Sequence, residues 1–189
     1  MIVALDEDVE SELAAGRLSC RCGGRLAPWS YARTRVVRQR SGAEVAIRPR
    51  RGRCVACGRT TVVLPAQALP RRRDATEVIG EALYLAARGH GHRSIAERLA
   101  RPPSTVRNWL RRARALAEAL RCQGLRVAHD CDPTLAPCTA HGTPLANAVE
   151  SLAVMARAFM RRHGVVGLSP WRVIAFKTGG LLVTRVPTG

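Results

Sequence analysis

Lysine is almost absent from this chain of 189 residues, in which Lys177 is the only lysine among 31 basic residues. Aromatic residues make up only 4%, so large rings cannot dominate a hydrophobic core. No apolar run approaches the roughly 20 residues needed to span a bilayer, which argues against a membrane protein. Hydrophobic residues nevertheless reach 47%, so we expect the chain to bury a core and fold.

Acidic residues are also few, 14 in all, and five of them lie within residues 1–12. An acidic start is the opposite of the basic start of a secretory signal peptide, so we expect a cytoplasmic protein. The later carboxylates are scattered, whereas metal-dependent strand transfer needs a cluster of them to hold Mg²⁺. We therefore predict that the chain is not an enzyme and takes no small-molecule substrate.

The formal net charge of +17 calls for an anionic partner. Part of this charge reflects an arginine bias typical of GC-rich coding sequences, so its distribution is more informative than its total. Residues 13–73 hold fifteen arginines against Glu44 alone, a net charge of +14. Such a basic segment suits phosphate binding, which depends on salt through counterion release.

Seven cysteines in a cytoplasmic chain favour metal ligands or free thiols over disulfides. Four of them form two close pairs, Cys20 with Cys22 and Cys54 with Cys57, and glycine follows each pair. Two such pairs suit a tetrahedral four-thiolate zinc site, in which glycine permits the tight turn under the metal. The first pair has a spacer of only one residue. The alternative is four unliganded thiols in a small β-unit.

The stretch between the cysteine pairs predicts strands. Residues 32–40 and 44–48 mix β-branched and polar residues on either side of the turn signal Ser41-Gly42, and residues 60–64 supply a third strand. Because this arginine-rich segment has few large apolar residues, it would need a metal to hold its fold. We therefore predict a zinc ribbon over residues 18–69, preceded by an acidic segment at 1–17.

An arginine run, Arg71, Arg72 and Arg73, follows the ribbon. These side chains are candidates to lie along DNA phosphates or to enter a minor groove, and a solvated linker is the equal alternative. Directly after them, Asp74 to Glu77 reads as a capping box with Asp74 as the N-cap. A first helix is expected from there to about residue 88.

A short second helix is predicted from about residue 93, and residues 101–103 form a turn. Ser104 then caps a third helix, in which Val106, Trp109 and Leu110 repeat at core spacing. A short helix, a tight turn and a longer amphipathic helix make a helix-turn-helix. We place this three-helix domain at residues 70–122, with Trp109 in its core.

The face of the third helix opposite its core is polar and basic. Arginine can pair with guanine, asparagine with adenine, and serine or threonine with phosphates or base edges. We therefore expect double-stranded DNA as the partner, and the alternative is a solvent face on an ordinary three-helix bundle. The candidate DNA-binding residues of this helix are Ser104, Thr105, Arg107, Asn108, Arg111 and Arg112.

The order of these motifs resembles an actinobacterial family of small proteins. The residues that carry the resemblance are the two cysteine pairs, the Leu-Pro-Arg-Arg-Arg-Asp segment and the run from Ile95 to Arg114, within residues 18–121. That family pairs a zinc ribbon with a helix-turn-helix like those of insertion-sequence transposases. The resemblance implies DNA binding, a link to mobile elements and the four cysteines as zinc ligands. Ala100 stands in the turn where such motifs often carry glycine.

The C-terminal region, residues 123–189, is predicted to be helical around a loop at 125–143. Residues 144–163 form an amphipathic pattern, and Ser169 reads as the N-cap of a shorter helix ending near Gly179. Packing on the helix-turn-helix is one role for this region, and dimerisation, which would extend the DNA site, is another. The loop also holds four residues that are either a second zinc site or unliganded, namely His129, Cys131, Cys138 and His141.

Together these features predict a mainly α protein with a small β zinc ribbon, a central helix-turn-helix and a C-terminal helical segment. We expect a DNA-binding transcriptional regulator or a transposition-associated accessory factor. One alternative is part of a split transposase or recombinase system. Another is an RNA- or protein-binding ribbon, against which we count the lack of exposed aromatic residues for base stacking.

Overall fold

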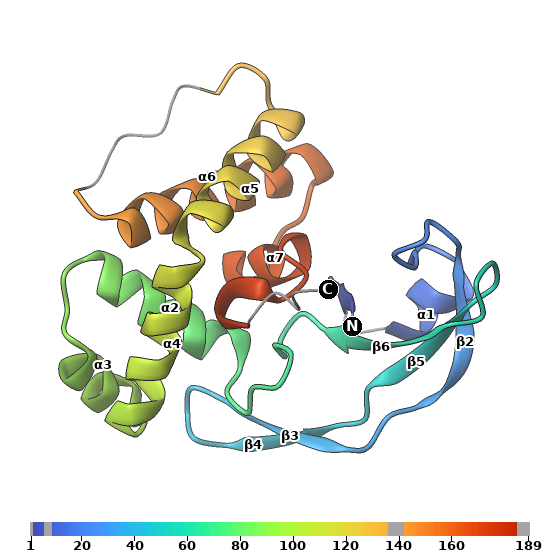
Figure 1. Cartoon of the computed structure of the whole chain (residues 1–189), viewed down its shortest axis with the longest axis horizontal. Helices are drawn as coiled ribbons and strands as arrows, with labels where there is room; N and C mark the ends of the chain where they lie inside the picture. The colour runs from blue at the N-terminus through green and yellow to red at the C-terminus, as the bar shows by residue number, and fades with distance from the viewer. Residues whose placement is uncertain (1, 6–8, 136–141, 185–189) are drawn as a thin grey trace.

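The N-terminal third of the chain forms strands and the remainder forms helices (Figure 1). The computed structural model describes residues 2–5, 9–135 and 142–184. A four-stranded sheet has the order β1-β6-β5-β2, in which β1 runs parallel to β6 and the other neighbours are antiparallel. Its elements, with the helix α1 that follows the first strand, are β1 (Ile2–Ala4), α1 (Val9–Ala14), β2 (Leu26–Tyr31), β5 (Arg50–Cys54) and β6 (Thr60–Pro65).

A separate hairpin leaves this sheet and reaches toward the helices (Figure 1). It consists of β3 (Arg35–Arg38) and β4 (Glu44–Ile47), which pair antiparallel around the turn. Gly42 in that turn has a φ of 89°, a left-handed conformation that glycine adopts without strain. The predicted hairpin and the predicted third strand, β6, are confirmed. Strands β1, β2 and β5 were not predicted: β1 has only three residues, β2 contains Pro28, and β5 consists mainly of arginines, so none carries a clear alternating hydrophobic pattern.

The acidic N-terminal segment belongs to the same β-unit. Leu13 of α1 packs with Leu26 and Val63 in a small core of its own. On the surface of that core, Glu10 of α1 pairs with Arg50 of β5 at 2.5 Å. Part of the positive charge of the sheet is therefore balanced by the N-terminal helix.

The three predicted helices of the helix-turn-helix are present as α2 (Thr76–Ala87), α3 (His92–Leu99) and α4 (Pro103–Ala115). Two predicted caps are wrong. Asp74 is not the N-cap of α2, because its buried carboxylate accepts hydrogen bonds from two arginines, and Ala75 takes the cap position. Ser104 does not cap α4, because the N-cap is Pro102, two residues earlier, and the helix begins at Pro103.

Four further elements follow α4: α5 (Ala117–Cys131), α6 (Pro144–His163), α7 (Pro170–Lys177) and the 3₁₀ turn η1 (Leu181–Val183). The bounds of α6 and the N-cap Ser169 of α7 agree with the prediction. The predicted loop at 125–143 is wrong in its first part, since α5 runs through Gly124 to Cys131. A Cβ on Gly124 would lie 2.9 Å from the carbonyl carbon of Ser151, so glycine lets α5 pack closely on α6.

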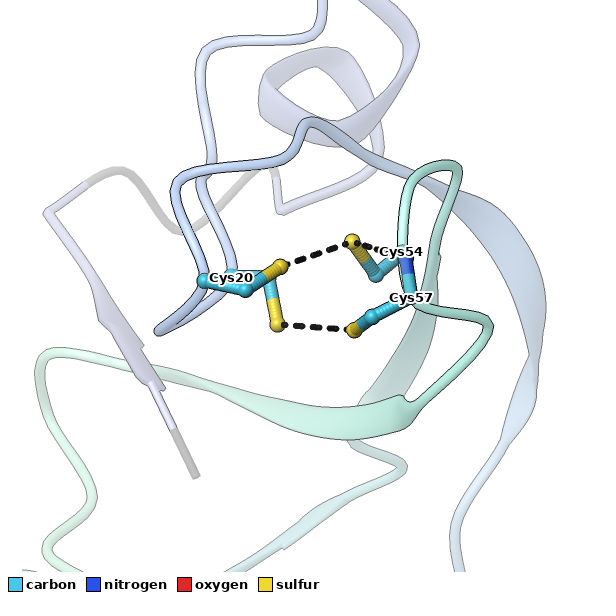
Figure 2. Close-up of side chains that lie close together, drawn as sticks. Cys20, Cys54 and Cys57 are labelled. Carbon is cyan, nitrogen blue, oxygen red and sulfur yellow. Dashed lines mark hydrogen bonds between the residues drawn. The ribbon is translucent and has the colours of Figure 1, made fainter.

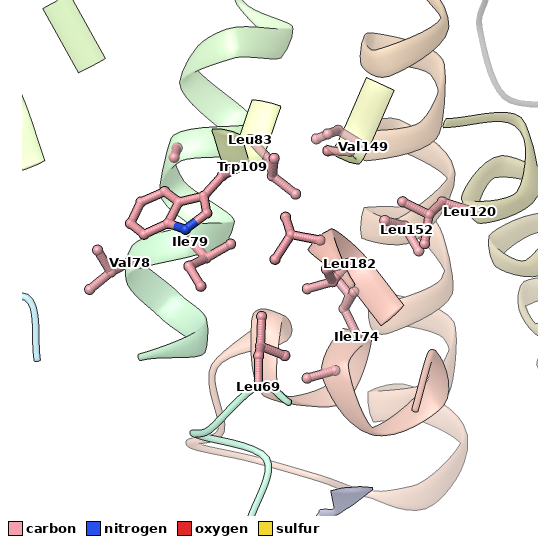
Figure 3. Packing of buried hydrophobic residues seen from close by; sticks show 14 of the residues in the cluster. Leu69, Val78, Ile79, Leu83, Trp109, Leu120, Val149, Leu152, Ile174 and Leu182 are labelled. Atoms are coloured by element: carbon pink, nitrogen blue, oxygen red, sulfur yellow. The ribbon is translucent and has the colours of Figure 1, made fainter. Parts of the chain in front are cut away.

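One hydrophobic core joins the helix-turn-helix to the C-terminal helices (Figure 3). Trp109 is only 4% exposed and lies beside Val78 and Ile79 of α2, which confirms its predicted place in the core. Leu152 of α6 and Ile174 of α7 belong to the same cluster. The C-terminal region therefore packs on the helix-turn-helix. Among the described residues, no helix combines the length and hydrophobicity required to cross a membrane.

Candidate nucleic-acid interface and metal centre

The two cysteine pairs meet at one end of the β-unit, where their sulfur atoms face one another (Figure 2). The Sγ atoms of Cys20 and Cys57 lie 3.8 Å apart, and those of Cys22 and Cys54 lie 3.5 Å apart. All four lie within 4.8 Å of one another. Zinc–thiolate bonds of about 2.3 Å in a tetrahedron place the sulfurs about 3.8 Å apart. The cluster therefore has the dimensions of a four-thiolate metal site, despite the one-residue spacer of its first pair.

Glycines shape both loops of this cluster. Gly23 and Gly58 have φ values of 85° and 71°, so each turns the chain back after its cysteine pair. A Cβ on Gly24 would lie 2.7 Å from the sulfur of Cys54, so only glycine leaves that sulfur room to face the others. The turn glycines expected after each pair are therefore present.

The environment of Cys54 favours a thiolate. The backbone N–H of Cys57 donates to its sulfur at 3.5 Å. This hydrogen bond outweighs the opposing effect of desolvation and, with the N–H of Ala56, lowers the pKa of the Cys54 thiol to about 6. Metals bind the thiolate form. Of the second predicted cluster, His129 and Cys131 lie on α5, whereas Cys138 and His141 lie outside the described residues.

The exposed face of α4 carries the polar and basic residues predicted for DNA contact. Arg107, Asn108 and Arg111 are exposed, and Nη2 of Arg111 donates to Oδ1 of Asn108 at 3.3 Å. The opposite face, which consists of Val106, Trp109, Leu110 and Ala113, is buried in the core. Of the other predicted residues on this helix, Ser104 is exposed, while Thr105 and Arg112 are partly exposed.

Residues 77–125 match the family model of a Homeodomain-like domain. No curated protein and no solved structure matches the chain. The matched residues cover nearly all of α2, the whole of α3 and α4, and the first half of α5. A homeodomain is a three-helix variant of the helix-turn-helix whose third helix reads the major groove. Helix α4 is the third helix of the segment that matches this model.

The three arginines before this domain have different environments. Arg71 is exposed and has a φ of 58°. Arg72 is partly buried and donates from Nη2 to the carbonyl oxygen of Val183 at 2.6 Å. Arg73 pairs with Glu44 of β4 at 3.3 Å on the surface. The segment is thus packed between the hairpin and the C-terminal turn, and only Arg71 and Arg73 present exposed side chains.

The hairpin β3–β4 is anchored to the turn of the helix-turn-helix by a network that sequence reasoning missed. Arg101, 5% exposed, donates from Nη2 to the carbonyl oxygen of Gln39 at 2.6 Å and from Nε to Asp74. Arg40 donates to the carbonyl oxygen of Arg98 at 2.8 Å. The hairpin of the β-unit is therefore held against the helix-turn-helix by these hydrogen bonds. No local pattern distinguishes Arg101 from the surface arginines around it.

The expectation that the ribbon lacks exposed aromatic side chains is wrong. Trp29 is 56% exposed and Tyr31 is 47% exposed, both on β2. The guanidinium of Arg53 lies 4.6 Å from the centre of the Trp29 ring, and that of Arg50 lies 4.1 Å from the centre of the Tyr31 ring. The low overall aromatic content did not indicate these exposed rings, because composition does not show which of the seven aromatic side chains lie on the surface.

Proposed function

We propose that this chain is a DNA-binding protein that reads double-stranded DNA with helix α4. The observation that carries the proposal is the division of α4 into a buried face and an exposed face in a homeodomain-like domain. The exposed Arg107, Asn108 and Arg111 have the donors and acceptors that recognise base edges in the major groove. Because all three come from one rigid helix, they can enter one groove together.

The basic ribbon and the arginine segment supply affinity for phosphates in this proposal. Phosphate contacts position a protein on the duplex without reading its sequence. The fixed link between Arg101 and Gln39 holds the hairpin beside the helix-turn-helix. The ribbon and α4 would therefore meet the duplex as one unit, and binding should weaken steeply with salt.

We infer that the cysteine cluster holds zinc and that its role is structural. Four thiolates leave no open coordination position, which is typical of structural rather than catalytic zinc. The resident ion would cross-link the loop around Cys20 to the loop around Cys54. Since the core next to these loops is small, such a cross-link would supply much of the stability of the ribbon.

A non-catalytic role as a transcriptional regulator or a transposition-associated accessory factor fits the carboxylates of the chain. Among the described residues, the four cysteines form the only group of metal-ligating side chains of three or more. Several of the described carboxylates are in ion pairs with arginines, such as Glu77 with Arg172 and Asp132 with Arg161. The resemblance of residues 18–121 to zinc-ribbon proteins with transposase-like helix-turn-helix domains favours the same reading.

Selection of binding sites from random duplex DNA tests the proposal. The zinc-loaded protein is compared with the variant Arg107→Ala/Asn108→Ala/Arg111→Ala and with the charge-matched control Arg126→Ala/Arg157→Ala, whose arginines lie on α5 and α6. We expect a short motif that the control keeps and the α4 variant loses, while salt-sensitive bulk binding survives in both. A palindromic motif would indicate a homodimer. No enrichment, or a motif unchanged in the α4 variant, would overturn the proposal.

Single-stranded nucleic acid is a second candidate ligand, favoured by the exposed Trp29. Bases stack on exposed aromatic rings, and neighbouring arginines hold the backbone. Oligo(dT) should then quench tryptophan fluorescence and bind Trp29→Ala more weakly than wild type. Tyr84 of α2 is the control, since it is also exposed (47%, against 56% for Trp29) and has an arginine, Arg88, over its ring. Equal binding by the Trp29 and Tyr84 variants would remove this candidate.

A further inference from the structure

A pocket with a volume of about 700 Å³ opens beside α4, between the arginine segment and the C-terminal turn. It is distinct from the cysteine cluster. Four arginines from two separate parts of the chain converge on it, and the small number of other lining side chains are apolar or uncharged. The lining residues are Arg71, Arg72, Arg111, Arg112, Ala115, Leu116 and Thr184.

Among the described residues no carboxylate lines this pocket, so its described walls do not balance the charges of the four arginines. Burial, together with the charges of Arg112 and Arg71, lowers the pKa of Arg72. Like charges held close together in a partly desolvated site repel one another, and an anion between them relieves that repulsion. Guanidinium groups are also the best-matched donors for phosphate, because their N–H groups bind two of its oxygens at once.

The position of Arg72 favours a small ligand over the backbone of a duplex. Its guanidinium is held back by the hydrogen bond of 2.6 Å to the carbonyl oxygen of Val183 in η1. It is therefore set into the pocket rather than projecting from the surface, where a duplex would pass. The volume of the pocket lies in the range of small-molecule sites, about 300–1,000 Å³. Leu116 and Ala115 form an apolar wall that could contact the part of a ligand that is not phosphate.

We propose that this pocket binds a phosphorylated small molecule, whose phosphate lies among Arg71, Arg72 and Arg112. The site goes beyond the proposed function, since it needs no DNA. One consequence does rest on that function. Arg111 lines the pocket and is hydrogen-bonded to Asn108 on the exposed face of α4, so a ligand that engages Arg111 would compete with DNA. By thermodynamic linkage, bound DNA would weaken the binding of the ligand by the same factor.

Calorimetric titration of the metal-loaded full chain with pyrophosphate, without DNA, tests the site. We expect one pyrophosphate per chain and a Kd raised about tenfold or more in Arg72→Gln, since each lost contact is a charge-assisted hydrogen bond. Because Arg72 also contacts Val183, Arg71→Gln provides a second variant at an exposed side chain. Arg126→Gln on α5, exposed and outside the pocket, is the charge-matched control and should bind as wild type does.

The outcomes separate the pocket from the proposed function. Absence of pyrophosphate binding, or equal weakening in the pocket variants and in Arg126→Gln, would overturn the pocket. If pyrophosphate fails to bind while Arg72→Gln weakens duplex binding, the pocket instead seats a phosphate of the DNA backbone, and the proposal is wrong. If pyrophosphate binds and needs Arg72 while site selection yields no DNA motif, the pocket stands and the DNA-reading function falls.

Discussion

Arg101 donates from Nε to the carboxylate of Asp74 at 2.5 Å, and the two side chains are 2% and 6% exposed. The same carboxylate oxygen accepts from Arg38 of β3 at 3.0 Å. One buried carboxylate thus joins the segment before α2, the turn between α3 and α4, and the hairpin β3–β4. This contact therefore links the turn before α4 to the β-unit.

Replacing Asp74 with alanine should destabilise the protein strongly. The change would leave the buried guanidinium of Arg101 without its counter-charge, which costs about 3–5 kcal/mol. Urea unfolding gives the free energy of unfolding for comparison with wild type. Glu44→Gln is the control, because it breaks an exposed pair with Arg73 and should cost less than about 1 kcal/mol. Similar losses in the two variants would show that the Asp74 network does not stabilise the fold.

Asp74 shows which features of this region can be predicted from the sequence and which cannot. The presence and approximate positions of the helices follow from local signals, such as the apolar spacing in α4 and the glycines around His90, and these predictions are confirmed. Asp74 followed by Glu77 satisfies the local pattern of a capping box equally well. Tertiary contacts prevent Asp74 from acting as a cap, because Arg38 and Arg101, which are distant in the sequence, both donate to its carboxylate. No single-sequence pattern contains that information.

The candidate sites divide in the same way. The cysteine cluster could be predicted from spacing, because two close pairs and their glycines act locally. The pocket beside α4 could not be predicted from the sequence, because it forms only when the fold brings Arg72 close to Arg112. The hydrogen bond from Arg72 to the carbonyl oxygen of Val183 is part of that tertiary structure. Strand β5 was missed because three of its five residues are arginine, although Gly52 packs against Leu13 and Leu26.

Removal of the proposed zinc should unfold the part of the β-unit around the cysteines and leave the helices largely folded, because Leu13, Leu26 and Val63 belong to a small core that is separate from the core of the helices. With a strong chelator we expect the amide signals of the loops around Cys20 and Cys54 to shift or broaden, while far-UV circular dichroism keeps its helical signal. Cys54→Ser should lose the bound zinc, measured as metal per chain. Cys122→Ser, an exposed cysteine of α5 outside the cluster, should retain it. Equal zinc content in the two variants would contradict the assignment of the ligands.

Glycine at position 100 should stabilise the protein. Ala100 ends α3 with a φ of 49°, a left-handed conformation that costs a residue with a Cβ about 1–2 kcal/mol. The greater freedom of glycine in the unfolded chain offsets part of the gain, so we expect about 0.5–1 kcal/mol and a higher Tm in thermal unfolding. Ala119→Gly, at an exposed position inside α5, should lower the Tm, because glycine weakens a helix interior. A decrease in both variants would show that the turn does not gain from glycine.

Alanine at position 80 should destabilise the protein, although alanine favours helices. A Cβ on Gly80 of α2 would lie 2.1 Å from the ring of Trp171 on α7. That ring would have to move, and overpacking of this kind costs about 1–3 kcal/mol. Gly91→Ala is the control, since nothing lies within 4 Å of the added atom and its φ is −74°. A Tm that falls for Gly80→Ala but hardly for Gly91→Ala would confirm the packing of α7 on α2; equal values would contradict it.

Two substitutions should separate base reading from phosphate binding in the DNA complex. Asn108→Ala should cost about 1–3 kcal/mol on the preferred site and little on unrelated duplexes, because an asparagine pair with adenine discriminates between bases. Arg73→Gln should weaken binding to both duplexes alike and reduce the salt slope by about one, as the loss of one phosphate contact does. The measurement is the Kd on both duplexes over a range of salt concentrations. If Asn108→Ala weakened both duplexes equally, α4 would contact the backbone, and the sequence preference would have to come from elsewhere on the protein.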